Sequence, residues 1–401
     1  MRDKKFTLTS TIKASPRAAY RAFTTNGGLL DWFCNSADVY ANIGRRFFTT
    51  TNEGYRIAGE YAELEEFQQI AIKTTLPELA TITIHLQADN GTTTLTLEYT
   101  SKDGSGLETH KKHWRAALKN LKSVLETGLD KRVFDQPMLG VIIGGTIDDN
   151  NQARYGLPFN YGIIITELVR GLGAEKVGIQ PDDVLVKMGE TDLVDFPALQ
   201  RAIAGFIAGD VIDVEWYRGG EKHAAQMTLA GRPKPKMPES PKALAEEVRG
   251  IYQRIQGEMA ELFDGVSEEE ADYRPAEGEW SAKEVVAHIL ATEKAAQLWT
   301  INTTKGRTFF NWATNDHLLV ESFAISYGQT IESLLEEMRK TEAQTLYILE
   351  NLPADSLDFK GSFMNIYQNF GPVGLPLHTR MHFKQIQDTL TIAKDALGET
   401  A

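Results

Sequence analysis

The chain has 401 residues, a formal net charge of −13 and a single cysteine. At about 150 residues per domain, this length predicts two or three domains. The acidic balance, with no long basic run, argues against nucleic acid or a membrane surface as a partner. One cysteine excludes an internal disulfide framework and any zinc site built on two thiolates. We therefore expect the chemistry of this protein to use other residues.

The expected location is the cytoplasm. From Phe6 onward the N-terminal residues alternate between polar and apolar side chains, unlike the continuous apolar stretch of a signal peptide. The sequence also has no run of about twenty apolar residues of the kind that spans a bilayer.

Residues 1–130 begin with strand-like periodicity. Apolar side chains alternate with Thr and Ser from Phe6 to Ile12, and Ser15-Pro16 is a typical helix start. We expect a short helix through Phe23, with Gly27-Gly28 as its stop. Asn90-Gly91, between two apolar alternating runs, predicts a type I′ hairpin.

The same segment ends in helical periodicity. Apolar residues from Leu107 to Leu125 recur on one stripe, and Gly128 is a typical helix stop. One sheet covered by one long helix is the expected fold. His110 and His113 on this helix have a spacing that metals can use, but with no third ligand nearby we expect a solvated helix face. Cys34 is expected to be a buried small hydrophobic residue.

This segment resembles the activator-of-Hsp90-ATPase-like branch of the START/SRPBCC helix-grip superfamily. The resemblance is carried by Ser15-Pro16, Leu30-Asp31-Trp32-Phe33, Gly44, Phe47-Phe48, Gly59-Glu60-Tyr61 and His113-Trp114. It implies an apolar cavity between helix and sheet and a small hydrophobic ligand. Trp32 and Phe33 either line this ligand pocket or pack the core, and core packing is the more common role of such aromatics.

Residues 133–232 are rich in glycine and short Val/Ile runs, which predicts a small β-barrel. The order of these strand-like runs and glycine turns resembles that of a bacterial PDZ domain. Met138, Leu139, Gly140 and Val141 stand where that family has its carboxylate-binding loop, and Phe196 through Ile207 is the expected groove helix. The resemblance implies capture of a peptide C-terminus by strand addition. The alternative is that the loop is only a tight structural turn. The Ser-His-Asp unit of a serine protease is not recognisable in the sequence.

Residues 233–241 are a proline-rich linker, and residues 242–401 are helical. Apolar periodicity predicts four long amphipathic helices, which begin near Leu244, Ser281, Ile331 and Leu377. Such a set is typical of a four-helix bundle. The complete prediction is a multidomain α+β protein: a helix-grip α/β sandwich, a small PDZ β-barrel and an all-α four-helix bundle.

Three histidines of the helical segment carry the strongest chemical signal. His378 and His382 are four residues apart, so they project from one helix face at a spacing that suits two ligands of one cation. If the second and fourth helices face each other, His288 supplies a third nitrogen and leaves one coordination position open. From spacing alone, histidines that hydrogen-bond in the core or face solvent are the more common explanation of such a pattern.

Residues 242–401 resemble a DinB-like (DinB/YfiT) four-helix bundle, through Trp280 to Leu290 and through His378 to Ile386. His288, His378 and His382 match the family's metal triad, which implies a divalent metal, with zinc or nickel suited to an all-imidazole site. Glu284 is either a further ligand, a general base or only a helix cap, and Gln385 either touches a bound water or packs against its neighbours.

Two classes of function remain open. One is a metal-dependent transferase or hydrolase that acts on a small electrophile or thiol adduct, together with a low-molecular-weight thiol. The resemblance to DinB-like bundles implies that some relatives are enzymes of this kind. The other is a non-enzymatic adaptor or stress and ligand sensor, whose PDZ module captures a peptide C-terminus.

Overall fold

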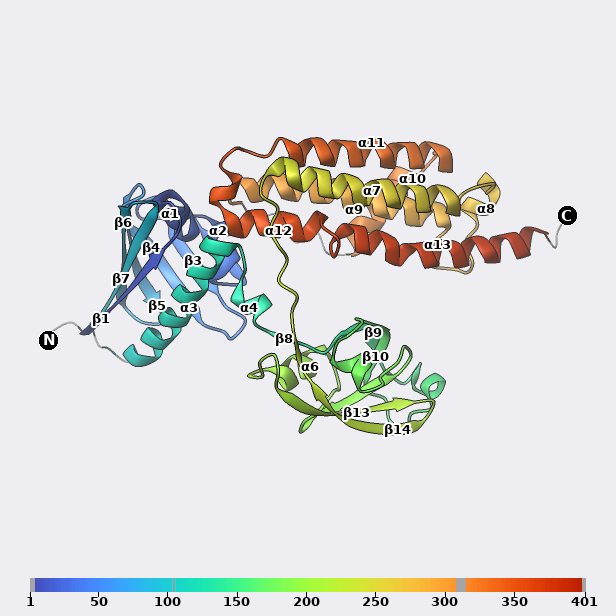
Figure 1. Ribbon diagram of the computed structural model, residues 1–401, viewed down its shortest axis with the longest axis horizontal. Helices are drawn as coiled ribbons and strands as arrows, with labels where there is room; N and C mark the ends of the chain where they lie inside the picture. The colour runs from blue at the N-terminus through green and yellow to red at the C-terminus, as the bar shows by residue number, and fades with distance from the viewer. Residues whose placement is uncertain (1–3, 103, 105, 308–314, 399–401) are drawn as a thin grey trace. The chain divides into compact units, whose positions relative to one another are not determined.

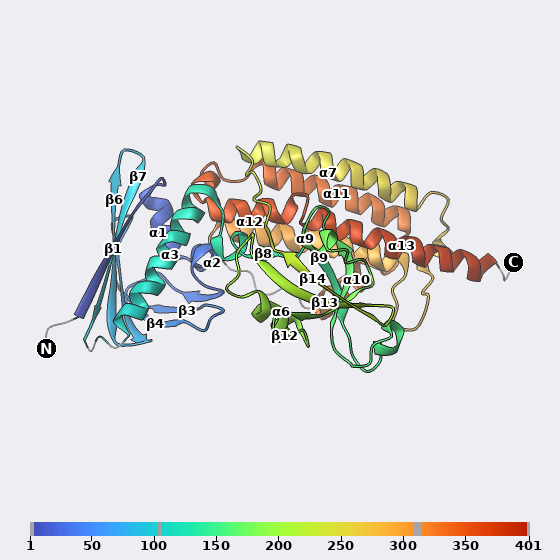
Figure 2. The same ribbon diagram turned by 60° about the horizontal axis from the view of Figure 1, so that its bottom comes forward.

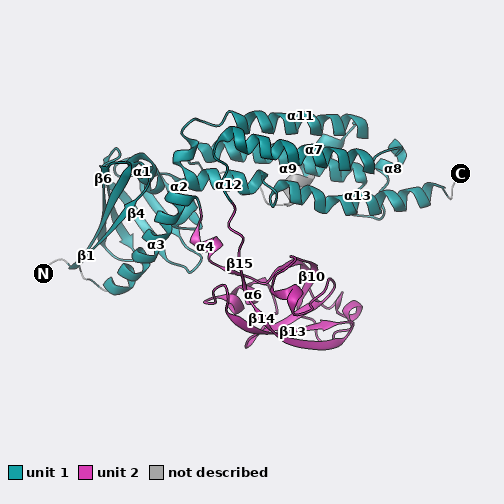
Figure 3. Ribbon diagram, in the orientation of Figure 1, with its two compact units in different colours: residues 1–128, 236–401 teal, residues 129–235 magenta. Residues whose placement is uncertain are grey.

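The computed structural model describes residues 4–102, 104, 106–307 and 315–398. The chain divides into two compact units, residues 1–128 together with 236–401, and residues 129–235 (Figure 3). The second unit is therefore inserted into the chain of the first. Among the described residues, no helix combines the length and the apolar composition needed to cross a membrane.

The N-terminal part of the first unit is a seven-stranded antiparallel sheet with the strand order β1-β7-β6-β5-β4-β3-β2. Its strands are β1 (Lys4–Ile12), β2 (Ser36–Val39), β3 (Arg46–Thr50), β4 (Arg56–Glu65), β5 (Gln69–Leu76), β6 (Ala80–Asp89) and β7 (Thr92–Ser101). Its helices are α1 (Pro16–Thr24), α2 (Asn26–Trp32) and α3 (Leu107–Thr127). Figures 1 and 2 both show α3 against one face of this sheet, as the sequence predicts.

Local signals set several of these boundaries. The side chain of Ser15 accepts a hydrogen bond from the backbone N–H of Ala18 and caps α1. Asn90 and Gly91 both have positive φ, at 42° and 81°, as the predicted hairpin turn requires. α1 ends at Thr24, one residue after the predicted Phe23. The predicted role of Gly27-Gly28 as the stop is wrong, because both glycines lie in α2, which starts at Asn26. A Cβ on Gly28 would lie 2.3 Å from the carbonyl oxygen of Arg21, so this glycine permits close packing of α1 and α2.

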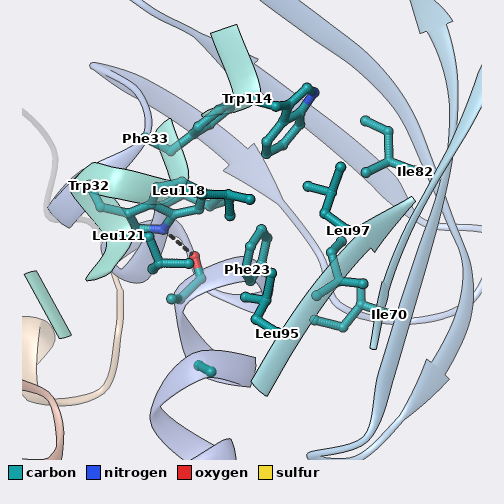
Figure 4. Packing of buried hydrophobic residues seen from close by; sticks show 14 of the residues in the cluster. Phe23, Trp32, Phe33, Ile70, Ile82, Leu95, Leu97, Trp114, Leu118 and Leu121 are labelled. Carbon is teal, nitrogen blue, oxygen red and sulfur yellow. Dashed lines mark hydrogen bonds between the residues drawn. The ribbon is translucent and has the colours of Figure 1, made fainter. Parts of the chain in front are cut away.

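Aromatic and aliphatic side chains fill the space between α3 and the sheet (Figure 4). Trp32 and Phe33 are 1% and 4% exposed, and the Phe33 ring stacks on Trp114 with centroids 5.0 Å apart. The indole N–H of Trp32 donates to the carbonyl of Ala22 at 3.0 Å. Both predicted pocket residues therefore pack in the core, and a ligand beside them stays a prediction. Cys34 is buried as expected.

The C-terminal part of the first unit is the helical bundle. Its helices are α7 (Pro241–Leu262), α8 (Glu268–Asp272), α9 (Ala282–Thr304), α10 (Asn315–Ser326), α11 (Ile331–Glu350), α12 (Lys360–Phe370) and α13 (Leu375–Gly398), with a 3₁₀ turn η2 (Ser356–Asp358). The four long helices α7, α9, α11 and α13 run side by side in both views and confirm the predicted bundle (Figures 1 and 2). The shorter helices α8, α10 and α12 accompany them.

Two buried carboxyl groups lie in the bundle core. Glu293 on α9 accepts hydrogen bonds from the hydroxyls of Tyr252, at 2.6 Å, and Thr345, at 2.5 Å. Glu342 on α11 accepts from the side-chain amide of Gln256. Burial raises the pKa of both carboxyls, that of Glu342 to about 8. The bundle therefore holds at least one protonated carboxylic acid in its core at neutral pH.

The helix-grip sheet and the bundle are docked through polar contacts. Asp31 on α2 accepts hydrogen bonds from the side chains of Ser362 and Asn365 on α12, both at 2.8 Å. A Cβ on Gly361 would lie 2.6 Å from Cγ1 of Val124, so the absence of a side chain allows α12 to approach α3 closely. These contacts join segments more than 230 residues apart, which is why the two parts form one compact unit.

The second unit is built on a sheet with the order β14-β13-β11-β10-β9, with β12 paired to β11 and a separate β8–β15 pair. Its strands are β8 (Pro137–Met138), β9 (Val141–Thr146), β10 (Ile163–Leu168), β11 (Val184–Met188), β12 (Thr191–Asp192), β13 (Val211–Arg218), β14 (Glu221–Thr228) and β15 (Ala230–Gly231). Its helices are α4 (Lys131–Phe134), η1 (Gln152–Tyr155), α5 (Gly173–Lys176) and α6 (Phe196–Ile203). The expected groove helix ends at Ile203 instead of Ile207, because Gly205 has a φ of +89° that a right-handed helix cannot continue.

Candidate metal centre

Two facing helices of the bundle bring the three predicted histidines together. A capping box, in which Ser281 and Glu284 bind each other's backbone N–H groups, starts α9 so that His288 lies two turns inside the helix. His378 and His382 lie one turn apart in α13. Buried apolar residues of both helices share one core cluster, which fixes the two helices face to face: Val285, Val286 and Ile289 from α9, and Ile386 and Leu390 from α13.

The imidazole nitrogens converge on one point. Nε2 of His378 and Nε2 of His382 are 3.2 Å apart, and the His288 ring centroid lies 5.3 Å and 5.1 Å from those of His378 and His382. One nitrogen from each of the three rings lies within 4.8 Å of the others. Two nitrogens bound to one zinc ion at about 2.05 Å with tetrahedral angles are about 3.3 Å apart. The 3.2 Å separation thus fits two ligands of one ion.

The electrostatics of the site favour neutral imidazoles. Burial, with a further contribution from the neighbouring histidines, lowers the pKa of His288 and of His378 to about 4. Both rings are therefore neutral at physiological pH. A neutral imidazole has the free lone pair that coordination requires.

Gln385 orients one of the three rings. Its side-chain oxygen lies 2.8 Å from Nδ1 of His382, so Nδ1–H donates to this acceptor and Nε2 keeps its lone pair. Outer hydrogen bonds of this kind fix the ring orientation of metal-binding histidines. The structure thus places Gln385 against its neighbour His382, and contact with a bound water stays a prediction.

His288 carries an unsatisfied atom. Its Nδ1 is buried and has no hydrogen-bond partner among the described residues, and the ring packs against Trp280 with centroids 5.0 Å apart. Leaving a buried polar atom unpaired costs about 1–3 kcal/mol. The donor set of three imidazoles, one with an orphaned nitrogen, therefore fits a divalent cation.

Neighbouring side chains define the rest of the site. The carboxylate of Glu284 accepts from the backbone N–H of Ser281 and pairs with Arg274, so it serves as a helix cap and ion-pair partner. Leu377 and Met381 stand next to the two histidines in α13 and are 38% and 55% exposed. The surface around the histidines on α13 is therefore partly apolar.

The expectation that His110 and His113 form a solvated helix face is wrong. His110 is 7% exposed, and its Nδ1 lies 3.0 Å from the hydroxyl of Tyr55. The His113 ring stacks on Tyr55 with centroids 3.7 Å apart. Helix spacing alone placed these histidines outside, whereas the aromatic partners that cover them come from distant strands and loops.

The predicted peptide-binding residues form one continuous turn in the second unit. Met138 ends β8, Leu139 is buried in the core, Gly140 has a φ of +83°, and Val141 starts β9. The carbonyl groups of Leu139 and Gly140 accept from Ala174 and Val169. In a trans peptide the N–H points opposite to the C=O, so the N–H groups of Gly140 and Val141 point away from these partners. β9 follows directly and is the last strand of the sheet.

The fold and the histidine cluster define a multidomain α+β protein with a helix-grip domain, a small β domain and a helical bundle. Family models match each part: Activator of Hsp90 ATPase homolog 1-like protein at residues 13–126, PDZ domain at residues 135–212, and DinB superfamily at residues 251–386. The chain is thus a three-module protein with domains of these three families.

Curated relatives are similar over short stretches only. The Serine protease Do-like HtrA of Lactococcus lactis subsp. lactis (strain IL1403) is 26% identical over 101 residues, which are 24% of this chain and 25% of the relative. The Probable periplasmic serine endoprotease DegP-like of Chlamydia muridarum is 33% identical over 100 residues, 23% of this chain and 20% of the relative. The chain thus spans about a quarter or less of these proteins.

Solved structures give further matches. The Aha1 dimer from Colwellia psychrerythraea is 21% identical, with a TM-score of 0.29, over 31% of this chain and 96% of that chain. An HSP90 activator from Plasmodium falciparum is 23% identical, with a TM-score of 0.27, over 30% of this chain and 95% of that chain.

Proposed function

We propose that the bundle binds one divalent metal ion, zinc or nickel, through His288, His378 and His382, and that this site acts on a small molecule. The observation that supports the proposal most strongly is the convergence of three imidazole nitrogens, two of them 3.2 Å apart. The rings of His288 and His378 are neutral at physiological pH. Bound to three imidazoles, such an ion lowers the pKa of a coordinated water or holds a thiolate.

The chain's own residues supply orientation and selectivity. Gln385 holds His382 with Nε2 toward the other rings, and Trp280 packs against His288. The exposed side chains of Leu377 and Met381 next to the histidines favour a small electrophile with an apolar part. These residues bind and position the substrate, and the reaction is a transfer or hydrolysis.

A reacting thiol has to come from another molecule. Cys34 is the only cysteine of the sequence, and it is buried in the helix-grip core at 1% exposure. A low-molecular-weight thiol is therefore the co-substrate that we propose for a transfer reaction. The cytoplasmic location remains a prediction, as do the module boundaries and the hydrophobic ligand of the helix-grip domain.

Metal analysis of the purified protein tests the site. Mass spectrometry of wild type should give about one zinc or nickel per chain, and His378→Ala and His382→Ala should each lose it, because two nitrogen ligands hold an ion far more weakly than three. His85 is exposed on β6, so His85→Ala is the matched control and should keep the metal. A metal-free wild type whose stability does not respond to added zinc or nickel would contradict the proposal.

The second candidate function is peptide capture by the PDZ module. It is supported by the edge position of β9 and by the N–H groups of Gly140 and Val141, which point away from the partners of the turn's carbonyl groups. These features suit strand addition and carboxylate binding. In this case the protein is an adaptor or sensor. Screening a library of peptides with free C-termini tests it. Amidation of a bound peptide's carboxylate should abolish binding, and unchanged binding would count against this mode.

A further inference from the structure

A second group of polar side chains lies far along the chain from the metal centre, in the helix-grip domain. Tyr55 directly follows an exposed turn at residues 52–54, and Glu78 lies in the connection between β5 and β6. Tyr99 and Ser101 on β7, with His110 and His113 on α3, complete the group. We refer to these six residues as the tyrosine cluster: Tyr55, Glu78, Tyr99, Ser101, His110 and His113.

Three members of the cluster form a chain of contacts from carboxyl to imidazole to hydroxyl. Nε2 of His110 lies 3.4 Å from Oε1 of Glu78, and Nδ1 of His110 lies 3.0 Å from the hydroxyl oxygen of Tyr55. With its proton on Nε2, facing the carboxyl group, the imidazole accepts the hydroxyl proton of Tyr55 at Nδ1.

The carboxyl group is itself held in place. Oε1 of Glu78 accepts from the hydroxyl of Tyr99 at 3.0 Å, and Oε2 accepts from the hydroxyl of Ser101 at 2.7 Å. The side chains of Glu78 and His110 are each 9% exposed. The base and the group that orients it are therefore buried, whereas Tyr55 is partly exposed at the end of the chain of contacts.

The protonation states of His110 and Tyr55 suit a base and the hydroxyl on which it acts: the His110 ring is free to accept a proton, and the Tyr55 hydroxyl still carries one. Burial lowers the pKa of His110 more strongly than the neighbouring Glu78 raises it, so the ring is neutral at physiological pH. Burial, with a further contribution from Glu78, raises the pKa of the Tyr55 hydroxyl, which therefore stays protonated. Such a hydroxyl becomes a nucleophile only when an adjacent base takes its proton as the new bond forms.

We propose that Tyr55 is an activated hydroxyl and that the tyrosine cluster is a second reactive site, which accepts the acyl group of a small activated acyl compound such as an aryl ester or a thioester. The Oη of Tyr55 bonds to the acyl carbon while its proton passes to Nδ1 of His110. The bond between the acyl carbon and the leaving group breaks, and the leaving group takes this proton. The product is an O-acyl tyrosine, and neither an oxidant nor a metal takes part.

His113 gives independent support for a ligand group next to Tyr55. Its ring stacks on that of Tyr55, and its Nε2 is buried without a hydrogen-bond partner among the described residues. Burial holds the pKa of His113 at about 4, so the ring is neutral. Protonated on Nε2, the ring has an N–H to donate to the oxygen of the acyl group.

Chemical acetylation tests the proposal without knowledge of the natural substrate. The intact protein is treated with 4-nitrophenyl acetate, and peptide mapping by mass spectrometry follows acetyl groups on individual tyrosines. Tyr40 and Tyr347 are 61% and 69% exposed and serve as internal references. Although Tyr55 is less exposed, we expect it to be acetylated at least about tenfold faster than either, since general-base assistance contributes about 10²-fold or more.

Two variants link this rate to the contacts. His110→Gln should reduce acetylation of Tyr55 below that of the references, and Glu78→Gln should reduce it less. Circular dichroism checks that each variant is folded. A wild-type rate at Tyr55 no higher than that at Tyr40 would overturn the proposal, and so would an unchanged rate in folded His110→Gln. If His110→Gln does not fold, the comparison within wild type decides.

Discussion

Replacing the buried Glu342 should make the bundle more stable, and the gain should grow with pH. The folded-state pKa of this carboxyl is about 8, because burial disfavours its charge, whereas an unfolded chain has a Glu pKa of about 4.3. A carboxyl with a raised pKa binds more protons in the folded state. Its contribution to stability is therefore complete at low pH and is lost as pH rises toward 8.

The two pKa values set the size of the effect. Between pH 6.5 and pH 8.5, loss of the proton from one such group lowers the free energy of unfolding by about 2 kcal/mol. Glu342→Gln keeps an oxygen that can accept from Gln256 but cannot ionise. The stability of Glu342→Gln relative to wild type should thus increase by about 2 kcal/mol over this range. The titration of the histidines cancels in this difference, because both proteins contain them.

Urea unfolding followed by circular dichroism at both pH values measures the difference. Glu336→Gln on the same helix is the control. Hydrogen bonds to Arg339 and Lys340 lower the pKa of Glu336, so this carboxyl stays ionised across the range and its replacement should show no pH trend. A stability difference between wild type and Glu342→Gln that is the same at both pH values would refute the reasoning.

Three further substitutions test the metal site, the docking of the two parts and the peptide turn. Gln385→Leu removes the acceptor that orients His382 and should weaken zinc binding about 10–100-fold by isothermal titration, and unchanged affinity would contradict the orienting role. Gly361→Ala places a Cβ 2.6 Å from Cγ1 of Val124 and should lower stability by about 1–3 kcal/mol in thermal unfolding, so an unchanged melting temperature would argue against close docking. Gly140→Ala strains a φ of +83° and should weaken capture of any C-terminal peptide found by screening, as measured by fluorescence polarisation, and full binding would contradict the role of this turn.

Features that depend on a few adjacent residues could be predicted from the sequence. The hairpin at Asn90-Gly91 and the capping box of Ser281 and Glu284 are local, because the backbone dihedral angles and cap bonds involve residues at most three positions apart. The spacing of His378 and His382 similarly fixes two rings on one helix face. The same holds for the long helices, whose apolar stripes repeat along one segment.

Features that depend on distant segments could not be predicted. The contacts of Asp31 with α12 join residues that are 331 and 334 positions apart in the sequence. No local sequence pattern indicates them. His110 was expected in solvent because its partners, Tyr55 and Glu78, come from two loops that only the folded sheet brings together. Glycines were also misjudged: Gly28 serves helix packing in the structure, whereas the sequence indicated a helix stop.

X-ray absorption at the zinc edge of protein loaded with one equivalent of zinc and then desalted tests the metal centre most directly. We expect a shell of about three nitrogen ligands at about 2.0–2.1 Å with imidazole scattering, and a smaller imidazole signal in His382→Ala. Loss of the zinc on desalting, or a shell of oxygen ligands with no imidazole, would contradict a metal site at His288, His378 and His382.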